Sequence, residues 1–515
     1  MSDPTPAPTS AAARHSDQKA RGYLASTVKH GGVYAIGTIL TRLVGFIMLP
    51  VYTHILTAAD YGVLEILSLT TDILSMLVGL GVRQAVLRYY YRYDTETERN
   101  AVISTAAVML VAAFLVVGGV GMAVAGPATD ALLGPGEPLH YFQLAIAGFA
   151  LQALADVPLV YLQARQRSGE LVTSNLIRLV IALSLNILFV VVLRIGVAGI
   201  FLSTIIASLL VGGVMMWRML RETGLHLVGR NARELLAFGA PLMVLQLGSF
   251  ILHFSDRYFL RYDRTLEEVG VYALSYKLAM MLGTFVIGPF YSIWTAKSLE
   301  IARREGEHAT PILASIMRHY NLVLVSCAFG LALFSTDVVH LAMGEAFQTA
   351  DRTVPVLAIG MVFFGYRQIS QVGAMIAERP GFVAWSSATA AAGAILLNLT
   401  LIPRYGAMGA AISTMSAFGL EFFIMRALSL RVHPVTVPLG ELFAPMAVAA
   451  AVWGAASLAV PAGAGELTGL GVRLVAALGY ALLIVVTGIL TADERRALKD
   501  IVRDPRSMLR SLRQA

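Results

Sequence analysis

Charged residues, cysteines and recognisable catalytic motifs are all scarce in this sequence of 515 residues, and each scarcity excludes a class of protein. Only 14% of the residues are charged, whereas soluble domains carry about 25%, so the chain cannot cover a soluble surface of its size. The single cysteine, Cys327, excludes an intramolecular disulfide and a metal site built on several thiolates. The patterns G-x-x-x-x-G-K-[ST], H-E-x-x-H and G-x-S-x-G do not occur. We therefore expect a protein that is not an enzyme, with no catalytic residue, no metal and no cofactor.

Long apolar runs are what the sequence has in abundance. Hydrophobic residues make up 57% of the chain, and its mean hydropathy is +0.71. Many runs are long enough to cross the roughly 30 Å of hydrocarbon in a bilayer, where only helices satisfy their own backbone hydrogen bonds. The sequence therefore predicts an all-α polytopic membrane protein with about fourteen transmembrane helices. The predicted spans are 31–55, 62–88, 101–125, 140–163, 171–193, 196–217, 235–258, 269–295, 311–335, 354–377, 382–402, 406–428, 438–460 and 469–491.

The distribution of Lys and Arg predicts the orientation. If the amino terminus and every second loop face the cytoplasm, 27 of the 39 basic residues lie there, 7 lie outside and 5 lie within helices. This asymmetry follows the positive-inside rule and places both termini in the cytoplasm. It also explains the pI of 9.4 through contact with anionic lipid, without a nucleic-acid partner. We expect residues 1–28 to be a disordered tail, and residues 492–515 to lie on the membrane surface or remain solvated.

Two motifs occur twice at almost the same separation. The pattern R-x-G-x-x-G-x-x-x-S-T spans 194–204 and again 404–414, and T-x-x-[DE]-x-G-V spans 57–63 and again 265–271. Repetition at a fixed offset indicates duplication of one structural unit. Because six helices separate the copies, both halves have the same orientation and are related by an axis along the membrane normal.

The duplication predicts the domain organisation. Residues 29–220 form a lobe of helices one to six, and residues 230–432 form a pseudo-symmetric lobe of helices seven to twelve. Residues 438–491 are then two appended helices, followed by the basic tail.

Several segments resemble a known family. They are Phe238-Gly-Ala-Pro241 with Val269–Lys277, then Ile402-Pro403-Arg404-Tyr405-Gly406, and Leu49-Pro50 with Arg88-Tyr89-Tyr90. In this order they resemble bacterial polysaccharide flippases of the multidrug/oligosaccharidyl-lipid/polysaccharide (MOP) exporter superfamily, over roughly residues 30–430.

The resemblance implies two lobes around a central cavity, and alternating access. It implies flipping of undecaprenyl-pyrophosphate-linked oligosaccharides across the bacterial inner membrane for O-antigen or exopolysaccharide synthesis. A glycan polymerase and a chain-length regulator are implied partners, besides membrane lipids.

Charged residues inside the predicted helices are candidate site residues. Each costs about 2.5–3.5 kcal/mol at the bilayer centre, so it should face protein or water. The seven-residue spacing of polar positions predicts one stripe on helix two and one on helix eight. Those stripes are Glu65, Asp72, Gly79 and Arg83 on helix two, and Lys277, Thr284 and Tyr291 on helix eight. Helix seven carries a polar arc of Gln246, Ser249, His253, Asp256 and Arg257.

The candidate residues fall into two roles. Arginine binds phosphate oxygens in a bidentate fork, so we predict a cationic cavity for the pyrophosphate. The predicted substrate-binding cations are Arg42, Arg83, Lys277, Arg367 and Arg178. The predicted ion-coupling carboxylates are Asp72, Asp156 and Asp256, with the coupling ion left open.

Alternatives remain open at this point for the roles of the charged residues and for the function. The buried charges can pair with one another and only hold helices together, as Asp156 and Arg178 would. Arg88, Arg178 and Arg257 can extend from helix ends to the membrane surface, and His253 can be a packing residue. A drug or metabolite exporter of the same superfamily is a rival function, and a membrane glycan polymerase or ligase is another. The outer loops do not exceed about twenty residues, which is short for such an enzyme.

Overall fold

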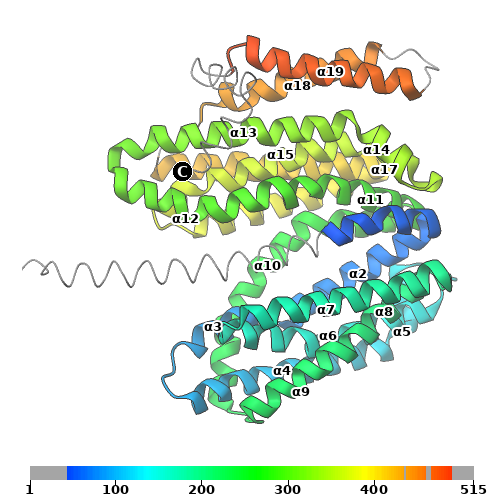
Figure 1. Cartoon of the computed structure of the whole chain (residues 1–515), viewed down its shortest axis with the longest axis vertical. Helices are drawn as coiled ribbons and strands as arrows, with labels where there is room; N and C mark the ends of the chain where they lie inside the picture. Colours follow the sequence, from blue (N-terminus) through cyan, green and yellow to red (C-terminus); the bar gives the residue numbers. More distant parts are fainter. Residues whose placement is uncertain (1–42, 80, 434–436, 460–465, 490–515) are drawn as a thin grey trace, which may run out of the picture. The chain divides into compact units, whose positions relative to one another are not determined.

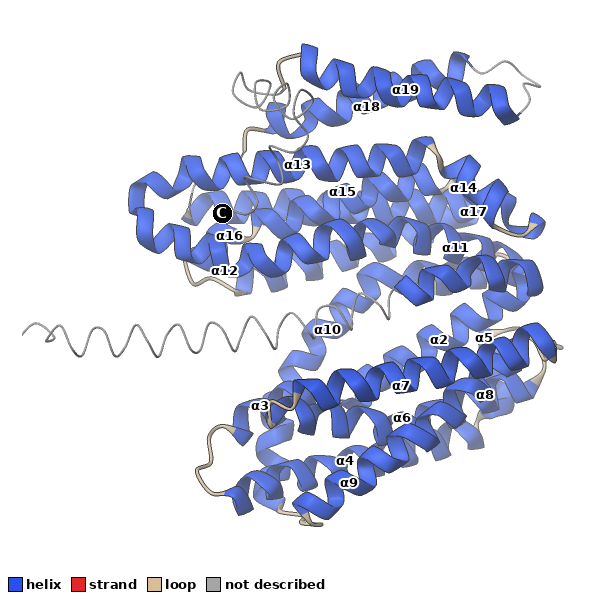
Figure 2. Ribbon diagram, in the orientation of Figure 1, coloured by secondary structure: helices blue, strands red, loops and turns tan. Residues whose placement is uncertain are grey.

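The computed structural model describes residues 43–79, 81–433, 437–459 and 466–489, and in these ranges it is helical without a strand. Figures 1 and 2 show that the described chain consists of helices joined by short connections. It divides into two compact units. The first unit comprises Met1–Leu56 and Val63–Leu247, and the second comprises Thr57–Gly62 and Gly248–Ala515. The all-α membrane fold predicted from the sequence is confirmed.

The helices keep the labels of Figure 1. A short apolar helix covers Leu43–Ile55. The α-helices that follow are α2 (Ala58–Gly79), α3 (Val82–Tyr90), α4 (Glu96–Ala123), α5 (Ala125–Leu132), α6 (Leu139–Ala164), α7 (Ser168–Asn186), α8 (Val197–Ala207), α9 (Gly213–Thr223), α10 (Gly229–Asp263), α11 (Leu266–Leu282), α12 (Gly288–Glu305), α13 (Ala309–Leu333), α14 (Ser335–Ala342), α15 (Val354–Ser370), α16 (Val372–Ile376), α17 (Gly381–Val432), α18 (Leu439–Ala459) and α19 (Glu466–Val486). The π-helical turns are η1 (Ile187–Val192), η2 (Ser208–Gly212) and η3 (Gly283–Ile287), and the 3₁₀ turns are η4 (Gly306–His308) and η5 (Glu345–Arg352).

The described residues contain ten helices long and apolar enough to cross a membrane, or eleven with α10, which is bent by 41° between two shorter arms. One of the ten is α17, whose 52 residues are interrupted at Gly406 by the non-helical angles φ 55° and ψ −132°. A straight helix of that length would span about 78 Å, so α17 is two membrane-length arms rather than one. The predicted count of fourteen crossings stays a prediction.

In the first unit, α6 is the central helix, and it packs against α3, α4, α7, α8 and α9. The predicted single polar stripe on helix two is wrong beyond Gly79, because the helix breaks there. Gly81 has φ +62°, and a Cβ on it would lie 2.7 Å from the carbonyl oxygen of Gly239. Only glycine fits that turn, and Arg83 therefore stands on a separate helix, α3.

In the second unit, α15 is the central helix, packed against α11, α13 and α17. The predicted continuous stripe on helix eight is also wrong. The π turn η3 falls between Lys277 and Tyr291 and interrupts the 3.6-residue repeat. The two side chains consequently have different partners: Lys277 contacts Tyr61, and the Tyr291 hydroxyl accepts a hydrogen bond from Gln371.

Both copies of the R-x-G-x-x-G motif make the same local structure. The first glycine turns the chain with positive φ, +69° at Gly196 and +55° at Gly406. The second glycine lets the following helix approach the preceding one. A Cβ on Gly199 would lie 2.9 Å from Cβ of Phe189, and one on Gly409 would lie 2.3 Å from the carbonyl oxygen of Leu401. The motif is thus a tight turn between two adjacent helices, used twice.

The T-x-x-[DE]-x-G motif also has one structural role in both copies. Thr57 and Thr265 cap the amino ends of α2 and α11, accepting backbone hydrogen bonds from the residues three positions on. The glycines that follow bring these two helices together. A Cβ on Gly62 would lie 2.0 Å from the Leu266 carbonyl oxygen, and one on Gly270 would lie 1.9 Å from the Ala58 carbonyl oxygen. The two copies of the motif therefore pack against each other, backbone to backbone, in the second unit.

Candidate functional site

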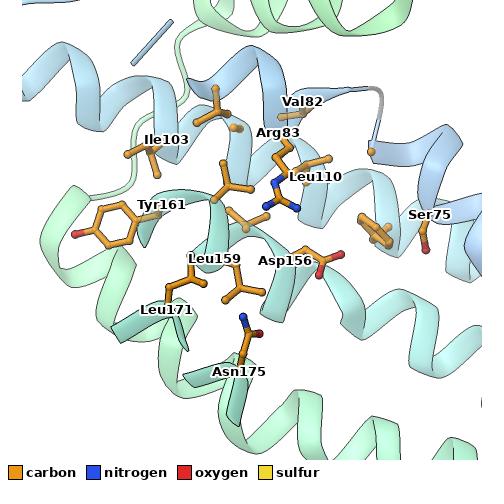
Figure 3. A pocket seen from close by; sticks show the side chains of 16 residues that line it. Ser75, Val82, Arg83, Ile103, Leu110, Asp156, Leu159, Tyr161, Leu171 and Asn175 are labelled. Atoms are coloured by element: carbon orange, nitrogen blue, oxygen red, sulfur yellow. The ribbon is translucent and has the colours of Figure 1, made fainter. Parts of the chain in front are cut away.

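A cavity of about 270 Å³ opens among the helices of the first unit, with Arg83 and Asp156 among its lining residues. Figure 3 shows the Arg83 guanidinium from α3 and the Asp156 carboxylate from α6 pointing into the same space, which Asn175 from α7 also faces. Arg83 donates through Nη2 to Oε1 of Gln163 at 2.9 Å and is otherwise exposed to the cavity. A guanidinium held at one edge keeps further N–H groups for an anion.

A second cavity of about 610 Å³ adjoins the first and shares Leu171 and Asn175 with it. Two more of the predicted site residues, Asp72 of α2 and Arg178 of α7, line this second cavity. Hydroxyl and amide groups complete the polar part of its lining. They are Ser68, Thr71, Gln152, Asn175, Thr204 and Ser208. The structure thus brings together around two adjoining cavities the four predicted site residues of the first unit that lie in its described part.

Polar and charged groups surround the Asp156 carboxylate. Ser75 donates to Oε1 of Gln152 at 2.8 Å, and Gln152 stands one helical turn before Asp156 on α6. Arg178 and Arg83 both act on Asp156 electrostatically. Within the described residues, however, neither forms an ion pair with it shorter than 4.0 Å. Two guanidiniums therefore share one carboxylate without direct contact. A phosphate group could bind the guanidiniums without first breaking a tight salt bridge.

The wall of the first cavity is tied to the basic loop after α6. The hydroxyl of Tyr161, a lining residue, donates to Glu222 of α9. Arg167 donates to the other oxygen of the same carboxylate at 3.1 Å. This hydrogen bond raises the pKa of the Arg167 guanidinium, which stays charged. The Tyr161–Glu222–Arg167 cluster therefore forms part of the cavity wall, and the charges of Glu222 and Arg167 in it pair with each other.

In the second unit, Asp256 and Arg257 form a closed buried pair. Arg257 Nη1 lies 2.7 Å from Oδ1 of Asp256, and the two side chains are 1% and 3% exposed respectively. Tyr272 and Thr414 donate to the other carboxylate oxygen of Asp256. The Arg257 guanidinium stacks 3.8 Å from the centre of the Tyr276 ring. The expectation that Arg257 extends to the membrane surface is wrong, because α10 continues past it and buries it.

The other predicted cations of the second unit also have protein partners. Arg367 lies 3.4 Å from the Glu421 carboxylate, which is 1% exposed, and Arg367 also donates to Gln371. Lys277 donates to the Tyr61 hydroxyl at 3.0 Å. These side chains occupy the helix-pairing role that the sequence left open as an alternative. Arg42 and the two predicted tails lie outside the described residues.

Sequence reasoning missed three of the residues that build the first-unit cavities: Gln152, Tyr161 and Asn175. A signal was present for two of them. Gln152 stands one helical turn before Asp156, and Asn175 stands one turn before Arg178, so each polar residue shares a helix face with a charge. Tyr161 gave no such signal, because its partner Glu222 is distant in sequence.

These observations define a multi-pass membrane protein with charged cavities inside a helical unit. A family model described as "Polysaccharide biosynthesis protein" matches residues 27–294, just over half of the chain. The chain belongs to this family of polysaccharide biosynthesis proteins. The curated relative "Probable low-salt glycan biosynthesis flippase Agl15" of Haloferax volcanii is 22% identical over 381 residues, which cover 73% of this chain and 78% of the relative.

Solved structures of transporters share the fold. A structure described as "Lipid II flippase MurJ, inward closed conformation" superposes with a TM-score of 0.71 at 11% identity, covering 89% of this chain and 99% of that one. An inward-facing multidrug resistance MATE family transporter of the MOP superfamily gives a TM-score of 0.55 at 16% identity, covering 76% and 98%. The predicted resemblance to polysaccharide flippases is confirmed at the level of the family, polysaccharide biosynthesis proteins, and these solved structures show the same fold.

Proposed function

We propose that this protein flips lipid-linked oligosaccharides from the cytoplasmic to the outer leaflet of a bacterial inner membrane. The substrate class is an undecaprenyl-pyrophosphate-linked glycan destined for O-antigen or exopolysaccharide, flipped by alternating access. A glycan polymerase and a chain-length regulator would use the flipped product. The observation that carries the proposal is the pair of adjoining cavities in the first unit, where Arg83 and Arg178 face a single central carboxylate. Family membership and the flippase relatives support it.

The chemistry of these cavities suits both parts of such a headgroup. A pyrophosphate needs fixed positive charge in a space of low dielectric constant, and two guanidiniums supply it. A sugar needs hydroxyl and amide partners, and the second cavity offers Ser68, Thr71, Asn175 and Thr204. The first-unit cluster of Arg83, Arg178 and Asp156 is therefore the proposed headgroup site. Asp72 and Asp156 remain the candidates for ion coupling.

The test is flipping of a short-chain lipid-pyrophosphate glycan by the purified full-length protein in liposomes. We expect Arg83→Gln and Arg178→Gln to slow flipping at least ten-fold, because a charge-assisted hydrogen bond contributes about 1.5–3 kcal/mol. The matched control is Arg304→Gln, which removes an exposed arginine of α12 that lines neither cavity. Wild-type rates in both cavity variants would contradict the proposed site.

An ion-coupled exporter of organic cations is the second candidate. It is favoured by Asp72 and Asp156, whose carboxylates line the same cavities and could bind a cation. The same reconstituted protein distinguishes the two functions. Gradient-driven uptake of an organic cation, with no flipping of the glycan lipid, would favour the exporter.

A further inference from the structure

A separate polar cavity of about 350 Å³ lies within the second unit, where α13, the first turn of α18 and the end of α19 meet. Its lining includes Arg318 and His319 from α13, Glu441 from α18 and Thr487 just after α19. None of these residues belongs to the first-unit cavities. Their charges and hydroxyl group are unusual for a space between membrane helices.

The position of the cavity along the helices places it near a membrane surface. Because α18 and α19 form a hairpin, the start of one and the end of the other lie on the same side, where Gly488 with φ +76° ends the helical run. Arg318 is nine residues into α13, about 14 Å from the start of that helix. α13 itself follows the basic end of α12 at Arg303 and Arg304. The cavity therefore lies at the end of the α18–α19 hairpin that the sequence predicts to face the cytoplasm.

Buried hydrogen bonds hold this cavity open. Pro445 has no backbone N–H, so the carbonyl of Glu441 one turn earlier lacks its helical donor. Asn321 of α13, 1% exposed, donates instead to the carbonyls of Glu441 at 3.5 Å and Leu442 at 3.0 Å. Tyr366 then donates to Oδ1 of Asn321 at 2.6 Å. These buried polar contacts fix α18 against α13. They thereby fix the wall of the cavity beside them.

The third wall is fixed in the same way. Tyr480 of α19 stacks on Phe329 of α13 with the ring centres 4.5 Å apart, and its hydroxyl lies 3.2 Å from Oγ of Ser326. These contacts set where α19 ends and therefore where Thr487 lies relative to Arg318.

We propose that this cavity binds the headgroup of an anionic phospholipid of the phosphatidylglycerol type. Arginine recognises phosphodiester oxygens in a fork. His319 bonds the Ser315 carbonyl through Nδ1 and can donate to a phosphate from Nε2 when the imidazole is protonated. The Thr487 hydroxyl donates to the Leu483 carbonyl and can accept from a headgroup hydroxyl. The Glu441 carboxylate suits the hydroxyl groups of a glycerol headgroup, which donate to it. Basic pockets between helices on the cytoplasmic side are typical sites for anionic headgroups. The bound lipid would join the α18–α19 hairpin to the rest of the second unit.

Native mass spectrometry of the full-length protein in detergent tests this proposal. The probes are dioleoyl-phosphatidylglycerol, dioleoyl-phosphatidylcholine and inorganic phosphate. We expect wild-type protein to retain one phosphatidylglycerol at least five-fold more tightly than phosphatidylcholine. Arg318→Gln should weaken retention of phosphatidylglycerol about ten-fold, as expected for one charge-assisted contact. Arg304→Gln, an exposed position outside the cavity, should leave it unchanged.

Three outcomes would overturn the proposal. The first is equal retention of both lipids by the wild type, and the second is equal loss in Arg318→Gln and Arg304→Gln, which indicates general surface charge. The third is displacement of the lipid by millimolar inorganic phosphate, which indicates a phosphate site without lipid specificity. Because Arg318 lies outside the proposed headgroup site for flipping, failure here leaves that proposal unaffected.

Discussion

At the scale of single residues, two intramembrane carboxylates differ in their surroundings, and we infer different roles from this difference. Asp156 faces a cavity and balances two arginines without a tight pair, whereas Asp256 is 3% exposed and bonded on both oxygens. Both are intramembrane aspartates on polar helix faces. Their surroundings assign them different roles.

We predict that Asp156→Asn removes the dependence of flipping on an ion gradient while the protein folds normally. The amide is isosteric and polar, so the local geometry survives, but the group can no longer exchange a proton and no longer carries the charge that binds a sodium ion. The measurement is flipping in liposomes with and without an imposed pH or sodium gradient. Retained gradient dependence would make Asp156 only a partner of the two arginines.

We predict the opposite phenotype for the matched substitution Asp256→Asn. Removing one partner of a buried ion pair costs about 3–5 kcal/mol, because Arg257 then stays buried without its counter-charge. A large drop in Tm of the purified protein is therefore expected, with gradient dependence retained in the fraction that folds. An unchanged Tm would show that the pair contributes little to stability.

The sequence predicted much of the candidate site, and the missing part has a physical reason. Helical spacing and hydropathy singled out Asp72, Arg83, Asp156 and Arg178, which line two adjoining cavities. They could not separate these residues from Asp256, whose partners are Tyr272 on the next helix and Thr414, which is distant in sequence. Pairing across helices depends on packing, which a single helix pattern does not contain.

At the scale of secondary-structure elements, hydropathy predicted where helices lie but not where they are interrupted. The breaks at Gly81 and at the π turn Gly283–Ile287 are short, and neither contains a proline that would have marked it. Both fall inside apolar runs that read as continuous helices. The repeated glycine motifs were visible in the sequence. The structure shows that their glycines allow two helix backbones to approach closely.

We predict that Gly62→Ala destabilises the second unit, because its Cβ would lie 2.0 Å from the Leu266 carbonyl oxygen. Overpacking of this kind costs about 1–3 kcal/mol. Gly270→Ala should have a similar effect, and the double variant should lose less than the sum, since the first Cβ already separates α2 from α11. Gly79→Ala is the control on the same helix, with nothing within 4 Å of its Cβ. Thermal unfolding measures all four variants, and a Tm for Gly62→Ala equal to that of the control would contradict the close contact.

At the scale of the whole molecule, the order of helices and the charge of the loops determine how the chain lies in a membrane. The turn at Gly406 separates the two hydrophobic arms of α17. The arms run antiparallel, as adjacent membrane crossings must. Basic residues cluster in the last turns of α9, in the first turns of α10 and at the end of α12, while Arg194 and Arg404 stand at the turns of the repeated motif. On the predicted topology, loops on the two sides of the membrane differ in composition, as the positive-inside rule requires.

We predict that reporters fused at Ala515 and inserted at Gly306 give cytoplasmic signals, and that one inserted at Gly134 gives a periplasmic signal. Gly134 lies between α5 and α6, and Gly306 between α12 and α13, so an odd number of predicted crossings separates them. The basic asymmetry of 27 residues against 7 fixes which of the two faces the cytoplasm. Alkaline phosphatase, active only outside, and green fluorescent protein, fluorescent only inside, report each position independently. The same side for Gly134 and Gly306 would contradict the predicted parity of crossings. Opposite sides with the signals exchanged would keep the helix order and overturn the orientation, which would also move the Arg318 cavity to the outer leaflet.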